Sequence, residues 1–155
     1  MLAQMRVSKY LPDKLFGFAA DSRMEVFFHL GSFDPKGLRS GHPKEGIVGW
    51  EWVSPPPILG ELVSVTLPDT LSVDKAPRAL RVERLEIPVA VTGVVEAFDP
   101  LRGYGFIKGT DGVSYHLHRS EMLGGHMPLP GNTVIFYAGT RQDRPRACHV
   151  KVFRG

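Results

Sequence analysis

Residues 102–107 read RGYGFI, and this short stretch decides the fold. Successive side chains of a strand point to opposite faces of the sheet, so Tyr104 and Phe106 are expected to share one face. We expect the glycines beside these aromatic residues to leave both rings uncovered. Two uncovered rings on one face form a flat stacking platform, which is the kind of surface that single-stranded nucleic acid requires.

The same pattern occurs earlier in the chain. Residues 14–18 read KLFGF and are followed by VFFHL at 26–30, just as RGYGFI is followed by SYHL at 114–117. A later motif also occurs twice, as APRA at 76–79 and as RPRA at 144–147. Motifs that recur in the same order predict two copies of one fold.

The distance between corresponding residues shrinks along the chain. Phe16 and Tyr104 are 88 positions apart, His29 and His116 are 87 apart, and the two prolines of the later motif are 68 apart. A constant order with a decreasing offset indicates an insertion in the first copy. We expect this insertion in the irregular segment 31–59, because it is rich in glycine and proline.

The motifs resemble those of the cold-shock domain family. The family combines a strand of the GFGFI type with a VFVHF strand, an EG-x-x-V strand and a P-x-A-x-x-V strand. Matching residues run from 7 to 82 in the first copy and from 93 to 150 in the second, so the resemblance covers nearly the whole chain. It implies small β-barrels of the oligonucleotide-binding (OB) type with single-stranded nucleic acid on the aromatic face.

Turn-forming residues divide each copy into five short strands. The predicted strands are 5–10, 16–20, 24–30, 60–67 and 78–85 in the first copy, and 91–98, 104–108, 113–117, 133–138 and 146–153 in the second. We therefore predict an all-β protein of two tandem five-stranded OB-type, cold-shock-like barrels. The first barrel spans 1–87, with the insertion 31–59 between its third and fourth strands, and the second spans 88–155.

The predicted binding face carries aromatic rings and histidines on the strands and basic side chains at the edges. Its residues are Lys9, Lys14, Phe16, Phe18, Phe27, His29 and Arg78 in the first copy, and Arg102, Tyr104, Phe106 and His116 in the second. Stacking one base on one ring contributes about 1–3 kcal/mol. The basic side chains add phosphate contacts that weaken as salt rises.

The two copies depart from the family pattern in different ways. Where the family has tryptophan in its first strand, the chain has Lys9 in the first copy and Ala97 in the second. In the alignment on histidine, Ser114 stands where the first copy has Phe27. We expect the first copy to be better suited to stacking and the second to be better suited electrostatically.

The charge of the two copies supports the expectation that the second copy attracts phosphate more strongly. Residues 1–87 hold eleven basic and eleven acidic side chains, whereas residues 88–155 hold eight and five, a net charge of +3.

No apolar run has the length of a membrane span, and the first residues lack the apolar core of a signal peptide. With a single cysteine there is no internal disulfide. We expect a cytoplasmic protein that does not bind membranes.

Catalytic and metal chemistry find little support in the sequence. His116 and His118 share a strand face, and a zinc site could be imagined with His126, Cys148 or His149, but no CxxC or His-x₃-His spacing supports it. GxSxG, P-loop and HExxH motifs do not occur, and the acidic residues are scattered. We predict no metal, no cofactor and no enzymatic activity.

These features predict a protein that binds single-stranded RNA or DNA. The resemblance implies a role as an RNA chaperone or as a regulator of transcription or translation. The alternative is a protein-interaction module, in which one or both barrels dock to a larger assembly through the second barrel or the 31–59 loop. Trp50 and Trp52 lie in that loop, where they either pack it onto the barrel or stack against a base or a partner.

Overall fold

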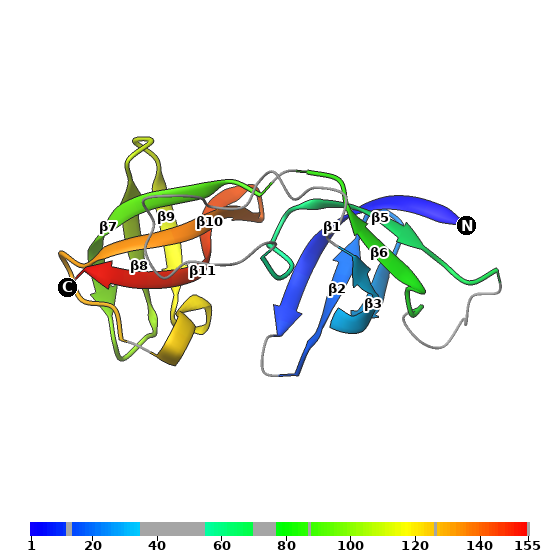
Figure 1. Cartoon of the computed structure of the whole chain (residues 1–155), viewed down its shortest axis with the longest axis horizontal. Helices are drawn as coiled ribbons and strands as arrows, with labels where there is room; N and C mark the ends of the chain where they lie inside the picture. Colours follow the sequence, from blue (N-terminus) through cyan, green and yellow to red (C-terminus); the bar gives the residue numbers. More distant parts are fainter. Residues whose placement is uncertain (12–13, 35–54, 70–76, 87, 126, 155) are drawn as a thin grey trace. The chain divides into compact units, whose positions relative to one another are not determined.

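The computed structural model describes residues 1–11, 14–34, 55–69, 77–86, 88–125 and 127–154 (Figure 1). Trp50 and Trp52 lie outside these ranges, as does most of the predicted insertion. The described residues divide into two compact units, Met1–Ser40 with Leu59–Ile87 and Gly41–Ile58 with Pro88–Gly155. Within the described ranges, no helix has the length and hydropathy needed to cross a bilayer.

The first unit contains a six-stranded sheet in the order β3-β2-β1-β5-β6-β4. Its elements are β1 (Leu2–Leu11), β2 (Phe16–Ala20), β3 (Glu25–His29), the 3₁₀ helix η1 (Leu30–Ser32), β4 (Phe33–Asp34), β5 (Leu62–Thr66) and β6 (Arg81–Arg84). A parallel bridge also joins Phe27 to Arg78. The Phe27 N–H donates to the Pro77 carbonyl, and the Ala79 N–H donates to the Phe27 carbonyl, both at 2.8 Å. The sheet therefore curls back on itself, from β3 to the segment before β6.

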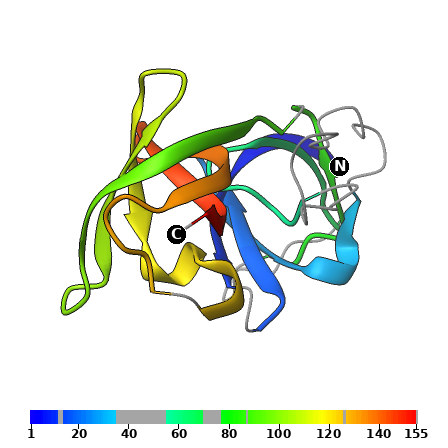
Figure 2. The same ribbon diagram turned by 60° about the vertical axis from the view of Figure 1, so that its left-hand side comes forward.

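The second unit is a closed barrel in the order β10-β11-β9-β8-β7 (Figures 1 and 2). Its elements are β7 (Ala90–Asp99), β8 (Tyr104–Gly109), β9 (Ser114–His118), the 3₁₀ helices η3 (Arg119–Glu121) and η4 (Leu123–Gly125), β10 (Thr133–Arg141) and β11 (Arg144–Arg154). The third and fifth strands meet in a parallel pair at His116 and Arg146. This pair is the counterpart of the Phe27–Arg78 bridge. The predicted all-β fold is confirmed, and the second unit has the predicted five-stranded barrel.

The first unit differs from the prediction because its last strand is short. In the second unit, Gln142 and Asp143 adopt positive φ and form a tight turn, so β10 and β11 stay paired up to Arg141 and Arg144. In the first unit β5 ends at Thr66, and Pro68 follows two residues later. Proline has no N–H to donate to a ladder, so pairing stops there. Among the described residues, the strand ladder of the first unit is consequently an open sheet that the Phe27–Arg78 bridge closes.

The structure corrects the predicted alignment of the third strands. Phe16 pairs with His29 in the first unit, and Tyr104 pairs with His118 in the second. Phe18 pairs with Phe27, and Phe106 pairs with His116. His29 therefore corresponds to His118, not to His116, and Phe27 corresponds to His116, not to Ser114.

Helix capping explains why these two histidines correspond. The Nδ1 atom of His29 accepts the Gly31 N–H at 2.9 Å and caps η1. The Nδ1 atom of His118 accepts the Ser120 N–H at 3.1 Å and caps η3. The second copy has two histidines two residues apart, and the sequence comparison matched His29 to the wrong one because the cap is not visible as a motif.

The short strand β4 was not predicted, because it lies at the start of the segment expected to be irregular. Phe33 of β4 pairs in parallel with Val82 of β6. The second unit has a corresponding contact, which is an isolated parallel bridge between Met122 and Val150. Phe33 and Met122 are both buried. The repeat therefore continues beyond the capping histidine, up to the start of the insertion.

The core of each unit is built from inward-facing aliphatic and aromatic side chains of its strands, which burial stabilises. Its buried members include Met5, Val26, Phe28, Val63, Val65 and Val82 in the first unit, and Val95, Ile107, Leu117, Val134 and Phe136 in the second. Val26 and Phe28 alternate with Phe27 along β3, and Tyr115 and Leu117 alternate with His116 along β9. The side chains of Phe27 and His116 therefore lie on the outer face of their sheet, opposite the core.

The glycines between the aromatic residues have a different role from the one expected. A Cβ at Gly17 would lie 2.5 Å from the Lys9 carbonyl oxygen, and one at Gly105 would lie 2.0 Å from the Ala97 carbonyl oxygen. Both carbonyls follow a register shift in the first strand of their unit. A bulge bends the strand towards its neighbour. The glycines are needed for this close approach on the inner face, and they do not serve to uncover the rings.

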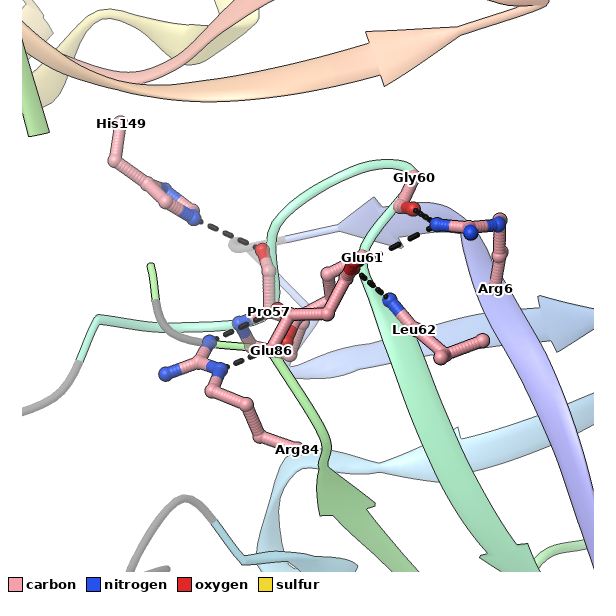
Figure 3. Close-up of polar contacts among 8 residues, drawn as sticks. All are labelled: Arg6, Pro57, Gly60, Glu61, Leu62, Arg84, Glu86 and His149. Carbon is pink, nitrogen blue, oxygen red and sulfur yellow. Dashed lines mark hydrogen bonds and ion pairs between the residues drawn. The ribbon is translucent and has the colours of Figure 1, made fainter. Parts of the chain in front are cut away.

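A buried ion pair stabilises the first unit near the end of its last strand (Figure 3). The Arg84 guanidinium donates to Glu61 through Nε at 2.7 Å and through Nη2 at 2.9 Å. The same guanidinium lies 5.0 Å from the centroid of the Phe33 ring. The Leu62 N–H donates to Glu86 Oε1 at 2.7 Å, which ties the start of β5 to the residues after β6. Removing one partner of a buried pair typically costs about 3–5 kcal/mol.

The last described part of the insertion, residues 55–58, groups with the second unit. Within that unit the Nε2–H of His149 donates to the Pro57 carbonyl at 2.9 Å (Figure 3). His149 is buried, and its φ of 52° lies in the left-handed region. A segment that precedes β5 in the sequence is therefore held by the final strand of the chain.

Candidate nucleic-acid interface

A row of side chains crosses four segments of the first unit on the face opposite its core. Cross-strand partners lie on the same face of a sheet. The row follows the strand register and consists of Lys9, Phe18, Phe27 and Arg78. The Phe18 and Phe27 centroids are 5.8 Å apart. The Arg78 guanidinium carbon lies 5.8 Å from the Phe27 centroid, so a cation covers one end of the row.

A second, shorter row lies beside the first. Phe16 pairs with Leu11 on one side and with His29 on the other. The Phe16 ring contacts Phe27 with centroids 5.1 Å apart and meets Phe18 edge to face at 6.0 Å. We call Phe16, Phe18, Phe27 and His29 the first platform. Its three phenylalanine rings are half-buried and His29 is exposed, so the rings keep each other in place while one side of the cluster faces solvent.

The turn before the first platform contributes another cation. Lys14 is exposed, and its N–H donates to the Leu11 carbonyl at 3.1 Å. Leu15 follows with a φ of 57°. The predicted site residues Lys9, Lys14 and Arg78 therefore lie at three different edges of the platform. This is the arrangement of cations expected around a stacking surface for a charged polymer.

The second unit carries the same rows with different side chains. The long row consists of Ala97, Phe106, His116 and Arg146. The short row consists of Asp99, Tyr104 and His118. We call Tyr104, Phe106, His116 and His118 the second platform. The imidazole of His116 stacks on Tyr104 with centroids 5.7 Å apart and planes inclined by 21°, and it meets Phe106 edge to face at 5.7 Å.

Arg102 takes the place of Lys14 before the second platform. Its Nη1 donates to the Tyr104 hydroxyl at 3.3 Å, and its Nε lies 3.7 Å from an Asp99 carboxylate oxygen. The Asp99 side chain also accepts the N–H groups of Leu101 and Arg102, which fixes the turn. The guanidinium is exposed and lies at the rim of the Tyr104 ring. The predicted association of Arg102 with this face is thus consistent with its position.

Both histidines of the second platform are held towards their neutral form. The pKa of His116 is lowered first by burial and then by the positive charges of Arg146, His118 and Arg141. The pKa of His118 is lowered by burial and by Arg146, Arg141 and Arg119, and is raised in part by Glu121. A neutral imidazole is a good stacking surface with one N–H donor.

The ends of the two long rows differ sharply. Arg78 is exposed, whereas Arg146 is only 5% exposed. The Nη2 atom of Arg146 lies 3.4 Å from Glu121 Oε2, and its buried Nε has no hydrogen-bond partner among the described residues. At the end of the long row, the first unit thus has an exposed guanidinium group, Arg78, whereas the second has a buried one, Arg146.

Two residues of this interface were not predicted as site residues. His118 was considered only as a zinc ligand, although its spacing from His116 already placed both on one face. Arg146 was treated as part of a motif, and its burial beside His116 depends on the pairing of β9 with β11, which no local pattern reveals. Among the described residues, no group of three or more His, Cys, Asp or Glu side chains is arranged to hold a metal ion.

Comparisons with known proteins find similarity among solved structures. No protein-family model matches the chain, and no curated protein matches it. Among solved structures it is similar to Drosophila Unr CSD456, with 17% identity and a TM-score of 0.40, over 99% of this chain and 61% of that one. It is also similar to a Streptococcus pneumoniae multidomain protein with nucleic acid binding domains, with 13% identity and a TM-score of 0.29, over 100% of this chain and 51% of that one.

The chain thus spans 61% and 51% of the lengths of these two structures. The all-β fold is shown by the strand order of the chain itself, with a closed five-stranded barrel in the second unit and a parallel pair of His116 with Arg146.

Proposed function

We propose that the protein binds single-stranded nucleic acid on its two platforms. The observation that supports this most strongly is the repetition of one layout in both units. In each unit, aromatic side chains of the second strand contact a ring of the third strand. A basic side chain lies in the turn that precedes the second strand. Contiguous apolar clusters exposed outside the core often mark interaction sites.

Stacking supplies the first part of the proposed interaction. Half-buried rings are fixed in place by their neighbours, so a base that stacks on them meets a surface that is already ordered. Each base–ring contact is worth about 1–3 kcal/mol and depends little on the identity of the base. We infer that the protein prefers flexible single strands and discriminates weakly among sequences.

Phosphate contacts supply the second part. Lys9, Lys14 and Arg78 surround the first platform, and Arg102 lies at the rim of the second. Each phosphate neutralised by such a cation releases counterions, so affinity falls as salt rises. If one strand reaches both platforms, the overall affinity rises through effective concentration. The proposed biological role is that of an RNA chaperone or a regulator of transcription or translation in the cytoplasm.

A fluorescence-anisotropy titration with labelled oligothymidylate and oligouridylate tests this proposal. We expect binding of both, weaker at about 200 mM than at about 50 mM salt. The variant Phe16→Ala/Phe18→Ala and the variant Tyr104→Ala/Phe106→Ala are each expected to bind more weakly. Leu129→Ala removes an exposed apolar side chain outside both platforms, and it serves as the matched control.

The outcomes separate the proposed function from its alternative. All variants are first checked for folding by circular dichroism. Binding that is lost in the platform variants and kept in Leu129→Ala supports the proposal. If the folded wild-type protein binds neither oligonucleotide, the nucleic-acid function is wrong and the platforms are better explained as protein-docking surfaces.

A further inference from the structure

His116 stands where the first unit has a phenylalanine. In the long row, Phe27 lies between Phe18 and Arg78, whereas His116 lies between Phe106 and Arg146. Both side chains contact the two aromatic rings of their second strand. Only the histidine can change its charge near neutral pH. The two platforms thus differ in chemistry at their central position.

The charges around His116 are unbalanced. Arg146 of β11, Arg141 of β10 and Arg119 of η3 act on the His116–His118 pair, and the carboxylate of Glu121 opposes them. That carboxylate already has two partners. Its Oε1 accepts the backbone N–H of His149 at 3.2 Å, and its Oε2 lies 3.4 Å from Arg146 Nη2. Arg146 is the guanidinium group that contacts this carboxylate, and the positive charge of Arg141 adds to that of Arg146 in lowering the pKa of His116.

The neighbours from β8 are aromatic and add no negative charge. Tyr104 stacks on the His116 ring and Phe106 meets it edge to face. Burial against these rings and the nearby guanidinium groups both disfavour the imidazolium ion. In the protein without ligand, His116 is consequently held neutral at pH 7. An anion beside it would reverse the electrostatic part of this balance, because it offsets the surrounding positive charge.

We propose that the His116 edge of the second platform is a phosphate-binding subsite, and that its occupation by a backbone phosphate is coupled to uptake of one proton by His116. This inference rests on the proposed function and specifies the chemistry of one of its two sites. The phosphate lies against the imidazole, the buried Arg146 acts on it from beneath without contact, and the proton comes from solvent to the free ring nitrogen. No bond to phosphorus forms or breaks.

The coupling has a definite sign. The bound phosphate raises the pKa of His116 above its value in the free protein. Between these two values the complex holds one more proton than the free components, so affinity rises as pH falls. One coupled proton gives a rise of at most about ten-fold per pH unit. Phe27 has no corresponding proton, so the first platform does not contribute to the effect at this position.

The test compares oligothymidylate affinities at about pH 7.5 and about pH 5.5, a range in which histidine titrates. The bases of oligothymidylate do not titrate there, and salt and a phosphate-free buffer are kept constant. The readout is the ratio of the two affinities, not the affinity itself. For the wild-type protein we expect a ratio of about five or more in favour of low pH. His116→Phe places the residue of the first unit in the second and is expected to lose most of this ratio.

A control variant separates His116 from its neighbour. His118→Asn keeps a side-chain acceptor for the Ser120 N–H, so it preserves the cap of η3. It is expected to keep more of the pH effect than His116→Phe. Histidine NMR signals then report the proton directly, and the His116 pKa is expected to rise when oligothymidylate is added. The same titration with inorganic phosphate shows whether the subsite takes free phosphate as well as the phosphate of a strand.

The outcomes distinguish this inference from the function on which it rests. If the wild-type protein binds oligothymidylate but its affinity does not rise at low pH, the subsite is wrong and the function stands. The same holds if His116→Phe keeps the full ratio or if the His116 pKa does not rise. If the folded wild-type protein does not bind at either pH, both proposals are wrong.

Discussion

The two platforms share a framework and differ in the side chains that they present. The long row of the first unit is Lys9, Phe18, Phe27 and Arg78, and that of the second is Ala97, Phe106, His116 and Arg146. The first row has cations at both ends of a phenylalanine pair. The second has lost one cation, buried the other and exchanged a phenylalanine for a histidine. We therefore propose that the first platform acts by stacking and that the second combines stacking with titratable charge.

The comparison shows which positions the fold itself requires. Gly17 and Gly105 are the same in both units because the bulged strand lies against them, and His29 and His118 are the same because each caps a 3₁₀ helix. These residues maintain the geometry of the face. Between these residues, core side chains such as Phe28 and Leu117 alternate with platform side chains such as Phe27 and His116. Only the platform positions lie outside the core, so a substitution there changes the outer face and leaves the core packing in place.

The largest expected effect concerns the two glycines. Gly105→Ala is expected to destabilise the protein by about 2–4 kcal/mol, because the new Cβ would lie 2.0 Å from a backbone oxygen that cannot move without opening the bulge. Gly17→Ala should cost less, since its clash distance is 2.5 Å. Urea denaturation measures both. Gly112→Ala, which meets nothing within 4 Å but has a φ of 85°, is the control for backbone strain alone. Equal stability of Gly105→Ala and wild type would contradict the close approach.

The next effect compares the rings that follow the two glycines. Phe18→Ala removes a ring that contacts both Phe16 and Phe27, so oligothymidylate affinity is expected to fall by about 1–3 kcal/mol. Phe106→Ala should have the smaller effect at pH 7, because its only ring partner in the third strand is a histidine. Anisotropy titrations of both folded variants measure the difference. A greater loss in Phe106→Ala would show that the second platform is the main stacking surface.

A smaller effect arises in the turn before each platform. Leu15 adopts a φ of 57°, and its counterpart Gly103 adopts 77°. Leucine is strained in this region and glycine is not, so Leu15→Gly is expected to stabilise the first unit by up to about 1 kcal/mol. Gly103→Ala should destabilise the second unit by a similar amount. Thermal unfolding checks both, and Leu15→Ala, which removes the side chain but keeps the strain, should leave the stability nearly unchanged.

The smallest expected effect is the pH dependence of stability. His116 and His118 have lowered pKa values in the folded protein, so the unfolded chain binds more protons as pH falls. Stability contributed by the neutral histidines is therefore present above about pH 6.5 and is lost progressively below it. His116→Phe should weaken this dependence. Urea midpoints at several pH values measure it, and a dependence unchanged in His116→Phe would argue against the lowered pKa of this residue.

Much of the fold was predictable because it depends on local patterns. The second strand, Phe16–Ala20, begins and ends where the sequence placed it, since a turn precedes it and alternation defines it. Most other strands were placed to within a few residues. Strand β4 was missed because its two residues form a strand only through their parallel pairing with Val82 and Glu83 of β6. Such a pairing joins residues far apart in the sequence and leaves no local period.

The candidate site was predictable to the extent that it follows alternation along a strand. Phe16, Phe18 and Phe27 lie together as expected, and so do Tyr104, Phe106 and His116. The alignment of His29 with His116 was wrong, because the capping contact that identifies His118 depends on backbone geometry. The burial of Arg146 was equally inaccessible, because the matching Arg78 is exposed and the two motifs look alike in sequence.

Chemical-shift mapping shows where on the protein single-stranded nucleic acid binds. Isotope-labelled wild-type protein is titrated with unlabelled oligothymidylate, and the backbone amide shifts are assigned to strands. If nucleic acid binds on the two platforms, the largest changes occur in β2 and β3 of the first unit and in β8 and β9 of the second. Changes concentrated on strands outside these four, or no changes at concentrations where the oligonucleotide binds other single-strand-binding proteins, would contradict it.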